Sequence, residues 1–329
     1  MKVINTIQLP NPYMVDSLTD DVTVKLIGSG SHVDMITLDP ESLGLVSRFS
    51  IETAVHDFYA SCIDDDCVYL PTKFGQILAL DKFSGEILAT INLGMPIMSN
   101  IVQDDENVYC ICGVPLSRKW EVIFTNFCVC ICDKNTGNKK VQTSYFNGNP
   151  TSLLKDGDSL WVIGGEYLIQ YSCDGEYLRK AHLGPNFEHT LIAKDHVICV
   201  STNGVVRALD KKKLELAALT NAQPCISKPF LIDEVLIWVT PSGICHVNFK
   251  EEVFRGIGAN REMLSDSLLS PDKTQLFAFD KAGSIVSFNL DSHAIQSIKL
   301  TQDTLRMPVI AEGNLLVMST TQLHQLKVD

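Results

Sequence analysis

The sequence lacks most of the signals that would place a protein in a membrane or outside the cell. Its 329 residues contain no run of 18 apolar residues, so no transmembrane helix is expected. The N-terminal segment Met1-Lys2-Val3-Ile4-Asn5 lacks the apolar core of a secretory signal peptide. Eleven cysteines, an odd number, occur without such a signal, which disfavours a disulfide framework. We therefore expect a cytoplasmic protein that does not associate with membranes.

Catalytic and cofactor motifs are also missing. The sequence contains no G-x-x-x-x-G-K-[ST], no G-x-G-x-x-G after a strand, no H-E-x-x-H and no G-x-S-x-G. Gly28-Ser29-Gly30 resembles a phosphate loop, but no helical pattern follows it, which favours a hairpin turn. The net charge of −12 repels phosphate backbones, and no block of five Lys or Arg residues counters it. We expect no cofactor and no nucleic-acid partner.

A repeated unit is the main positive signal. Its clearest copy runs from Cys67 to Gly94 and alternates apolar strands with turns rich in Gly, Asp, Asn and Ser. A period of about 40 residues is the size of one four-stranded propeller blade. The first strand of each visible unit follows an acidic turn and begins near Val24, Cys67, Asn107, Ser159, His196, Val235, Gln275 and Asn314.

An innermost strand is expected just before each acidic turn. We place these strands at 13–18, 53–62, 95–103, 150–154, 188–193, 224–232, 264–270 and 306–311. The last unit ends at Asp329 without an outer strand, and the chain's first residues, Lys2 to Leu9, have the pattern of the missing strand. The sequence therefore predicts one all-β domain over residues 1–329: an eight-bladed propeller closed by the N-terminal strand. Seven blades remain the alternative if one degenerate unit does not form.

Three segments resemble parts of a known repeat. Gly75 to Glu86 reads GQILALDKFSGE and is similar to the PQQ-like repeat, G-x-(I/L)-x-A-L-D-x-x-(T/S)-G-(E/K). Gly204–Asp210 repeats its first half and Ile131–Gly137 its second. The Trp that usually ends this repeat is replaced by Ala89. The resemblance implies a propeller of the quinoprotein type, but the quinone enzymes of that type are secreted and longer, so quinone binding is not expected here.

Polar residues of the predicted inner strands are the first candidates for chemistry. A His189–Cys225 pair on adjacent blades could form an activated thiol, and His56 is a further proton carrier. The favoured interpretation, however, is that these side chains merely line a wet channel, and a further alternative is that they bind a ligand or peptide. The same strands also contain Asp57, Glu188, Lys228 and Arg306.

Five cysteines in the third unit are the second candidate. Cys110 and Cys112 share one face of a strand, and Cys128, Cys130 and Cys132 share one face of the next, because side chains alternate along a strand. Four thiolates could hold zinc or an iron–sulfur cluster. The spacing is unlike that of zinc sites, however, and cysteine often packs as a small apolar residue, which is the favoured interpretation.

A long loop in the third unit is the third candidate. The insertion between residues 114 and 121 contains Arg118, Lys119 and Trp120, and Trp and Arg are enriched at binding hot spots. If this loop binds a partner, residues near the same mouth of the channel would join it: Phe187, Arg261 and Arg306. The alternative, which the sequence favours, is a longer hairpin with Trp120 folded back on its own blade.

Three functions are therefore open. The favoured one is a non-catalytic, monomeric scaffold that binds a protein or peptide partner at one mouth of the channel. The first alternative is a lyase, hydrolase or cyclase sited in the channel. The second is a sensor or carrier of a small ligand or metal.

Overall fold

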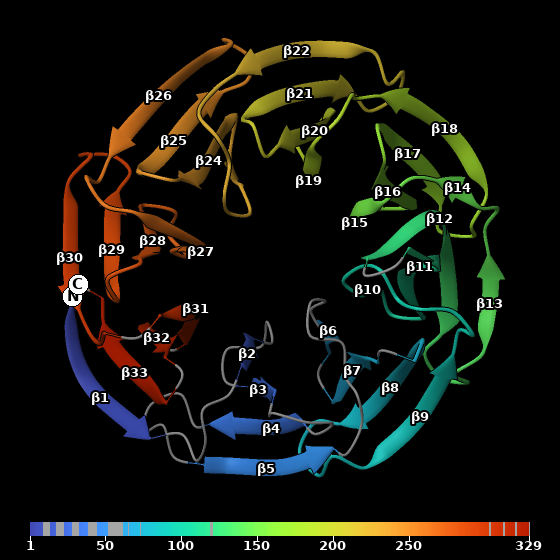
Figure 1. The fold of residues 1–329 in the computed structure, drawn as a ribbon, viewed down its shortest axis with the longest axis horizontal. Coiled ribbons are helices and arrows are strands. Elements are labelled where there is room, and N and C mark those ends of the chain that lie inside the picture. Colours follow the sequence, from blue (N-terminus) through green and yellow to red (C-terminus); the bar gives the residue numbers. More distant parts are fainter. Residues whose placement is uncertain are drawn as a thin grey trace.

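The chain folds into a ring of antiparallel sheets. The computed structural model describes residues 1–329 except 9–13, 18–22, 28–32, 39–44, 52–61, 65, 73, 119–120, 303, 312, 320 and 329. The described strands form eight sheets, seven with four strands and one with five, arranged around a common axis (Figure 1). This architecture confirms the predicted all-β propeller. Within the described residues, no helix is long and apolar enough to cross a membrane.

We number the sheets along the chain, each from its inner to its outer strand. Sheet 1 contains β2 (Met14–Ser17), β3 (Thr23–Ile27), β4 (Val33–Leu38) and β5 (Leu45–Ile51). Sheet 2 contains β6 (Cys62–Ile63), β7 (Cys67–Pro71), β8 (Gln76–Asp81) and β9 (Ile87–Asn92). Sheet 3 contains β10 (Val102–Gln103), β11 (Asn107–Arg118), β12 (Glu121–Asp133), β13 (Lys139–Gln142) and β14 (Phe146–Asn147). Sheet 4 contains β15 (Pro150–Asp156), β16 (Ser159–Gly164), β17 (Tyr167–Ser172) and β18 (Tyr177–His182).

The second half of the ring repeats this order. Sheet 5 contains β19 (Phe187–Ile192), β20 (His196–Ser201), β21 (Val205–Asp210) and β22 (Leu216–Asn221). Sheet 6 contains β23 (Phe230–Ile232), β24 (Val235–Thr240), β25 (Gly243–Asn248) and β26 (Val253–Gly258). Sheet 7 contains β27 (Met263–Leu269), β28 (Gln275–Asp280), β29 (Ser284–Asn289) and β30 (Ile295–Lys299). Sheet 8 contains β31 (Arg306–Ala311), β32 (Asn314–Met318), β33 (Gln322–Lys327) and β1 (Lys2–Gln8).

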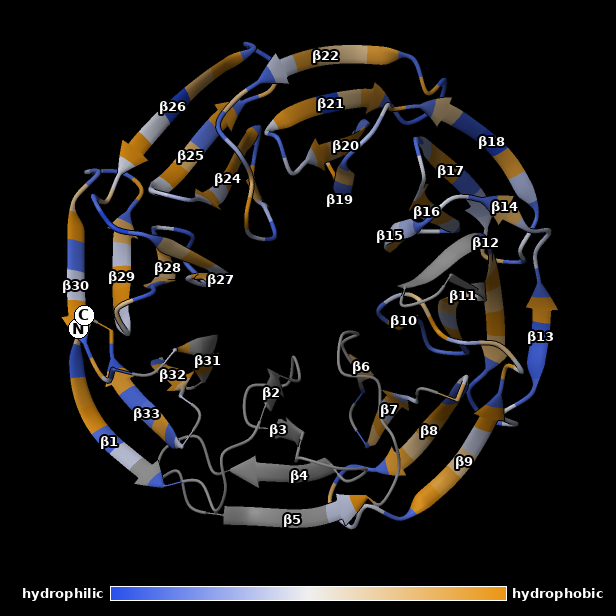
Figure 2. Cartoon of the chain, viewed as in Figure 1, coloured by the Kyte–Doolittle hydropathy of each residue, from blue (hydrophilic) through white to orange (hydrophobic). Residues whose placement is uncertain are grey.

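The middle strands are apolar on both faces because neighbouring sheets cover both. Almost every residue of β16 and β24 is buried, whereas outer strands such as β18 are largely exposed. Figure 2 shows this difference as orange middle strands and mixed outer strands. The core therefore lies between adjacent sheets: Ile198 and Val200 of sheet 5 pack in one cluster with Leu236 and Trp238 of sheet 6.

The turn motifs that recur along the chain have a direct structural cause. Asp81 Oδ1 accepts hydrogen bonds from the backbone N–H of Phe83 and Ser84, which caps the turn from β8 to β9. Gly75 has φ +74°, and a Cβ there would lie 2.1 Å from the backbone oxygen of Met95 in the next loop. Glycine is required at this turn by both its backbone angle and this close approach.

Units without the full motif keep the same turn by using asparagine. Asn248 Oδ1 accepts hydrogen bonds from the backbone N–H of Lys250 and Glu251, and Asn289 accepts one from Ser292. Asn replaces Asp because both offer the same acceptor oxygen two or three residues before the N–H groups.

The pairing of the two chain ends is as predicted. The N-terminal strand β1 pairs antiparallel with β33, from Lys2↔Lys327 to Gln8↔Gln322. Thr6 Oγ1 lies 3.1 Å from His324 Nδ1 across this pair. Figure 1 shows the N and C labels side by side at sheet 8. The ring is closed by strand pairing between the first and last residues of the chain.

Some predicted inner strands are shorter than expected. The ranges 95–103 and 224–232 were expected to be strands, but β10 and β23 are only Val102–Gln103 and Phe230–Ile232. In these two segments a serine hydroxyl replaces a backbone oxygen as hydrogen-bond acceptor for the neighbouring strand. Ser99 Oγ accepts from Ile111 N–H at 2.8 Å, and Ser227 Oγ accepts from Val239 N–H at 2.9 Å. The prediction for 53–62 falls mostly outside the described residues.

The two faces of the ring differ in charge. One face, here the turn face, contains the turns between first and second and between third and fourth strands. The other, the loop face, contains the turns between second and third strands and the loops that lead to the next sheet. The charged residues in the described connections of the loop face are Glu166, Lys228, Arg261, Glu262 and Lys281.

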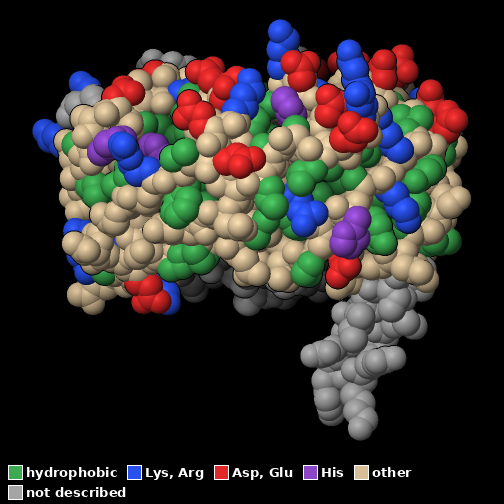
Figure 3. Space-filling model, turned by 90° about the horizontal axis from the view of Figure 1, so that it is seen from above, with side chains coloured by type: hydrophobic (Ala, Val, Ile, Leu, Met, Phe, Trp, Pro, Cys, Tyr) green, Lys and Arg blue, Asp and Glu red, His purple; other side chains and the backbone are tan. Residues whose placement is uncertain are grey.

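The turn face holds most of the remaining connection charges, and Figure 3 shows them gathered along one rim. Some of them join neighbouring sheets there. The ammonium of Lys134 lies 2.8 Å from the Asp64 carboxylate of the preceding sheet, and that of Lys211 lies 2.6 Å from Asp156.

Candidate binding site at the loop face

Two adjoining cavities lie along the inner strands near the loop face. The first, about 470 Å³, is bounded by the loop at 98–100, by β15, by β19 and by Lys228 and Pro229. The second, about 700 Å³, is bounded by β19, by residues 225–228 and by Ser265–Ser267 of β27. Both volumes lie in the range typical of ligand sites. Glu188, His189 and Lys228 line both cavities, so these three residues mark the junction between them.

The junction contains exposed charges without partners in the described structure. Glu188 and Lys228 are solvent-exposed, and no ion pair or hydrogen bond joins the side chain of either to another described residue. The other charges of the loop face are paired: Arg261 Nη1 lies 2.8 Å from Asp280 Oδ2, and Lys281 contacts Glu262.

His189 is a neutral hydrogen-bonding group at this junction. Burial, and then the positive charge of Lys228, lower the pKa of His189 to about 4. The imidazole therefore presents one donor and one acceptor nitrogen near neutral pH. This state suits recognition of polar groups and does not suit proton exchange at pH 7.

The structure does not support an activated thiol at Cys225. His189 and Cys225 both line the larger cavity, as the sequence suggested. However, burial raises the pKa of Cys225 to about 12, and its thiol donates to the backbone oxygen of Ser227 at 3.1 Å. Cys225 is 2% exposed and packs in the cluster around Trp238. A protonated, buried thiol is a poor nucleophile.

Hydroxyl groups form much of the cavity wall. Two of them, Thr190 Oγ1 and Ser267 Oγ, are buried and have no hydrogen-bond partner in the described structure. Thr190 lines the smaller cavity and Ser267 the larger. Both hydroxyls retain hydrogen-bonding capacity on either side of the junction.

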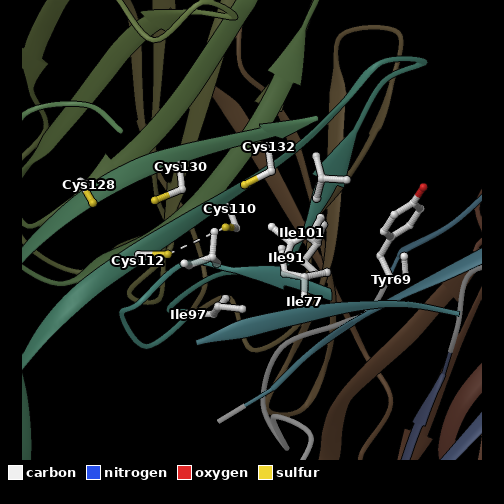
Figure 4. Close-up of a cluster of buried hydrophobic side chains, with 13 residues drawn as sticks. Tyr69, Ile77, Ile91, Ile97, Ile101, Cys110, Cys112, Cys128, Cys130 and Cys132 are labelled. Atoms are coloured by element: carbon white, nitrogen blue, oxygen red, sulfur yellow. Dashed lines mark hydrogen bonds between the residues drawn. The ribbon is translucent and has the colours of Figure 1, made fainter. Parts of the chain in front are cut away.

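The cysteines of sheet 3 form part of the core. Register pairs Cys110 with Cys130 and Cys112 with Cys128, so the two sets that the sequence placed on one face of each strand do come close. All five cysteines are fully buried in a cluster with residues such as Ile77 and Ile91 of sheet 2 (Figure 4).

The electrostatics of this cluster are those of packed thiols. The thiols of Cys112 and Cys128 lower the pKa of Cys130 by hydrogen bonding, and burial raises that of Cys132. Among the described side chains, no group of three or more Cys, His, Asp or Glu residues has an arrangement that could hold a metal ion. The cluster therefore packs as small apolar side chains.

The predicted partner-binding residues have different outcomes. Phe187 was expected on the surface, but it is 4% exposed and lies under the guanidinium of Arg207, so it is a core residue. Arg261 is at the loop face and is held by Asp280 and by Ser297.

The remaining candidates lie outside the described residues. These are Lys119, Trp120 and His56, together with the side chains of Arg118 and Arg306, whose backbones belong to β11 and β31. The β11–β12 hairpin that carries the insertion has strands of 12 and 13 residues, far longer than the others described.

Comparison with known proteins gives the fold class. No protein-family profile and no curated protein sequence matches this chain. Solved structures do match it. The computationally designed protein Ika8 is similar with TM-score 0.77 and 10% identity over 98% of both chains. Sqt1 from Saccharomyces cerevisiae has TM-score 0.71 and 10% identity over 99% of both chains.

The C-terminal WD40 domain of Sif2 has TM-score 0.69 and 12% identity, covering 100% of this chain and 96% of that domain. The chain has a WD40-like β-propeller architecture. At these identities the likeness concerns the fold alone, and the resemblance to PQQ-like repeats remains one of single turns.

The sequence placed Glu188 and Lys228 among the polar candidates of the inner strands but did not bring them together as one site. Nothing in the sequence shows that the loop at 225–229 brings Lys228 beside β19. One available signal was the polar content of segments 150–154, 188–193 and 264–270, which the sequence had placed on the channel wall.

Proposed function

We propose that this protein is a non-catalytic scaffold that binds a protein or peptide partner at its loop face. In this proposal each of the eight sheets is one blade of a single propeller domain, and the protein acts as a cytoplasmic monomer. The observation that carries the proposal is the junction of the two cavities, where the carboxylate of Glu188 and the ammonium of Lys228 have no partner in the described structure. A rigid ring with variable connections at one face suits recognition.

Two further observations support binding over catalysis. Cys225 is protonated and buried, and His189 is neutral, so the described part of the junction has no activated nucleophile. The described connections of the loop face also contain few charged residues, so few other side chains attract or repel a partner that approaches Lys228.

The long β11–β12 hairpin extends the proposed interface. We propose that Arg118, Lys119 and Trp120 contact the same partner, because β11 ends at Arg118 and β12 begins at Glu121 on the loop-face side of sheet 3. Their replacement by alanine should abolish partner capture and leave the melting temperature within a few degrees. Retained capture would remove this hairpin from the interface.

The proposal is tested by blocking the junction. The tagged protein is expressed at native level in its own host, captured gently and analysed by protein identification and native mass. Glu188→Trp should reduce recovery of a stoichiometric partner at least tenfold, because a bulky aromatic side chain at the junction would obstruct the passage between the two cavities and remove the carboxylate. Lys194→Trp, at the turn-face end of the same strand, is the matched control and should leave recovery unchanged.

Two outcomes would contradict the proposal. One is recovery of the chain alone, with no protein or peptide bound, from every version including wild type. The other is equal recovery of a partner by wild type and Glu188→Trp, which would place the interface elsewhere.

A further inference from the structure

We infer that the occupant of the junction is an extended segment of a partner protein that carries an acidic and a basic side chain close together. This inference rests on the proposed function and specifies the chemistry of the partner. It starts from the two charges of opposite sign, Glu188 and Lys228, which line the same pair of cavities.

The charged side chains of the loop face divide into those that already pair with another side chain and those that do not. Arg261 is bound by Asp280, and Lys281 contacts Glu262. Asp266, which also lines the larger cavity, is already engaged in an interaction. Among the described residues of the two cavities, this leaves one ammonium and one carboxylate available to an occupant.

Desolvation decides which occupant fits. A neutral segment that displaced water from the junction would leave both charges unpaired, which is costly. A segment with one charge would satisfy one group and leave the other. A segment with both signs places a carboxylate at Lys228 and a cation at Glu188. A segment with the two charges in the opposite order would bring like charges together at both residues and would therefore be rejected.

The position of the junction shows that the segment passes through. Cavity space extends from Lys228 in two directions, toward β15 and toward β27. A chain end anchored at Lys228 would leave one cavity empty, so the acid is an Asp or Glu side chain within the segment. The spare hydroxyls of Thr190 and Ser267, one beside each cavity, are placed to bond the segment's backbone on both sides once they rotate.

The test uses a displayed library of random 12-residue peptides with no assumed partner. Wild type should enrich peptides that carry an acidic and a basic residue within a few positions of each other. Lys228→Glu should lose the acidic preference, and Glu188→Lys should lose the basic one. Each should bind the wild-type peptides on the order of tenfold more weakly, as for loss of one charge pair. The double variant should again select both signs, in the reverse order along the peptide.

A control and the fold are checked in parallel. Lys194→Glu reverses an exposed charge at the opposite end of β19 and should select the same peptides as wild type. All versions should melt at the same temperature, because the three substituted side chains are exposed. The comparison then reports recognition and is independent of stability.

The outcomes separate the two claims. Identical charge patterns in peptides selected by wild type and Lys228→Glu would overturn this inference and leave peptide binding at the loop face standing. Failure of wild type to enrich any peptide over the control resin would count against both the inference and the proposed function.

Discussion

Removal of the N-terminal strand β1 should open the ring. The strand contributes six registered residue pairs with β33, equivalent to about six ladder hydrogen bonds. At about 0.5–1.5 kcal/mol net for each bond, deletion of residues 1–8 costs about 3–9 kcal/mol. A typical domain is stable by only about 5–15 kcal/mol, so the truncated chain should be marginal. Loss of β1 also leaves β33 as an unpaired edge that can pair with other chains.

The assay is urea denaturation followed by circular dichroism, with size-exclusion chromatography for the oligomeric state. The truncated chain should unfold at a much lower urea concentration and elute partly as aggregates. A synthetic peptide of residues 1–9 should restore much of the stability by re-forming the strand pair. An unchanged midpoint with a monodisperse truncated chain would refute the argument that strand pairing of the two ends stabilises the ring.

A circular permutant provides the matched control. Because Lys2 pairs with Lys327, the two termini are adjacent, and two added glycines between Asp329 and Met1 give a five-residue turn. The turn from β8 to β9, residues 82–86, has this length. New ends between Lys212 and Lys213 again leave one sheet closed by both termini, so this permutant should keep nearly wild-type stability.

Three further changes probe the core and the site. Trp238→Phe should lower the free energy of unfolding by about 2–3 kcal/mol in urea titrations, because it removes the bond to Gln223 O and leaves a void. Gly75→Ala should cost more than Gly94→Ala, since both have positive φ but only the first meets backbone within 3 Å; equal melting temperatures would contradict this. Burial lowers the pKa of His189 from 6.5 to about 4, so its contribution to stability is present above pH 6.5 and is lost as pH falls toward 4. His189→Gln should flatten the pH dependence of the melting temperature across that window.

The repeat was readable because its turns need particular residues. Strands start where the sequence places them, at Cys67, Asn107 and Ser159, because an acidic or Asn cap and a run of apolar residues both mark the boundary. The placement of the cysteines on one face of β11 and on one face of β12 followed from the period of two, whereas their pairing depends on the register of the two strands.

The site was less predictable because it depends on packing between sheets. The inner strands at 95–103 and 224–232 were overestimated, since Ser99 and Ser227 replace backbone partners through side-chain oxygens that carry no strand signal. Phe187 looked like an exposed loop residue, but at the start of β19 its aromatic side chain points into the core. The meeting of Lys228 with β19 is a long-range contact that no local pattern encodes.

The strand pairing between the chain's two ends also constrains how the protein is made. During synthesis β1 leaves the ribosome long before its partner β33, because about 300 residues separate the two strands in the chain. The sheet of β1 and β33 cannot form until residues 322–327 have been translated, so β1 stays without its partner strand until then. Premature termination anywhere before residue 322 would release a product that cannot seal itself and exposes a free edge to other chains.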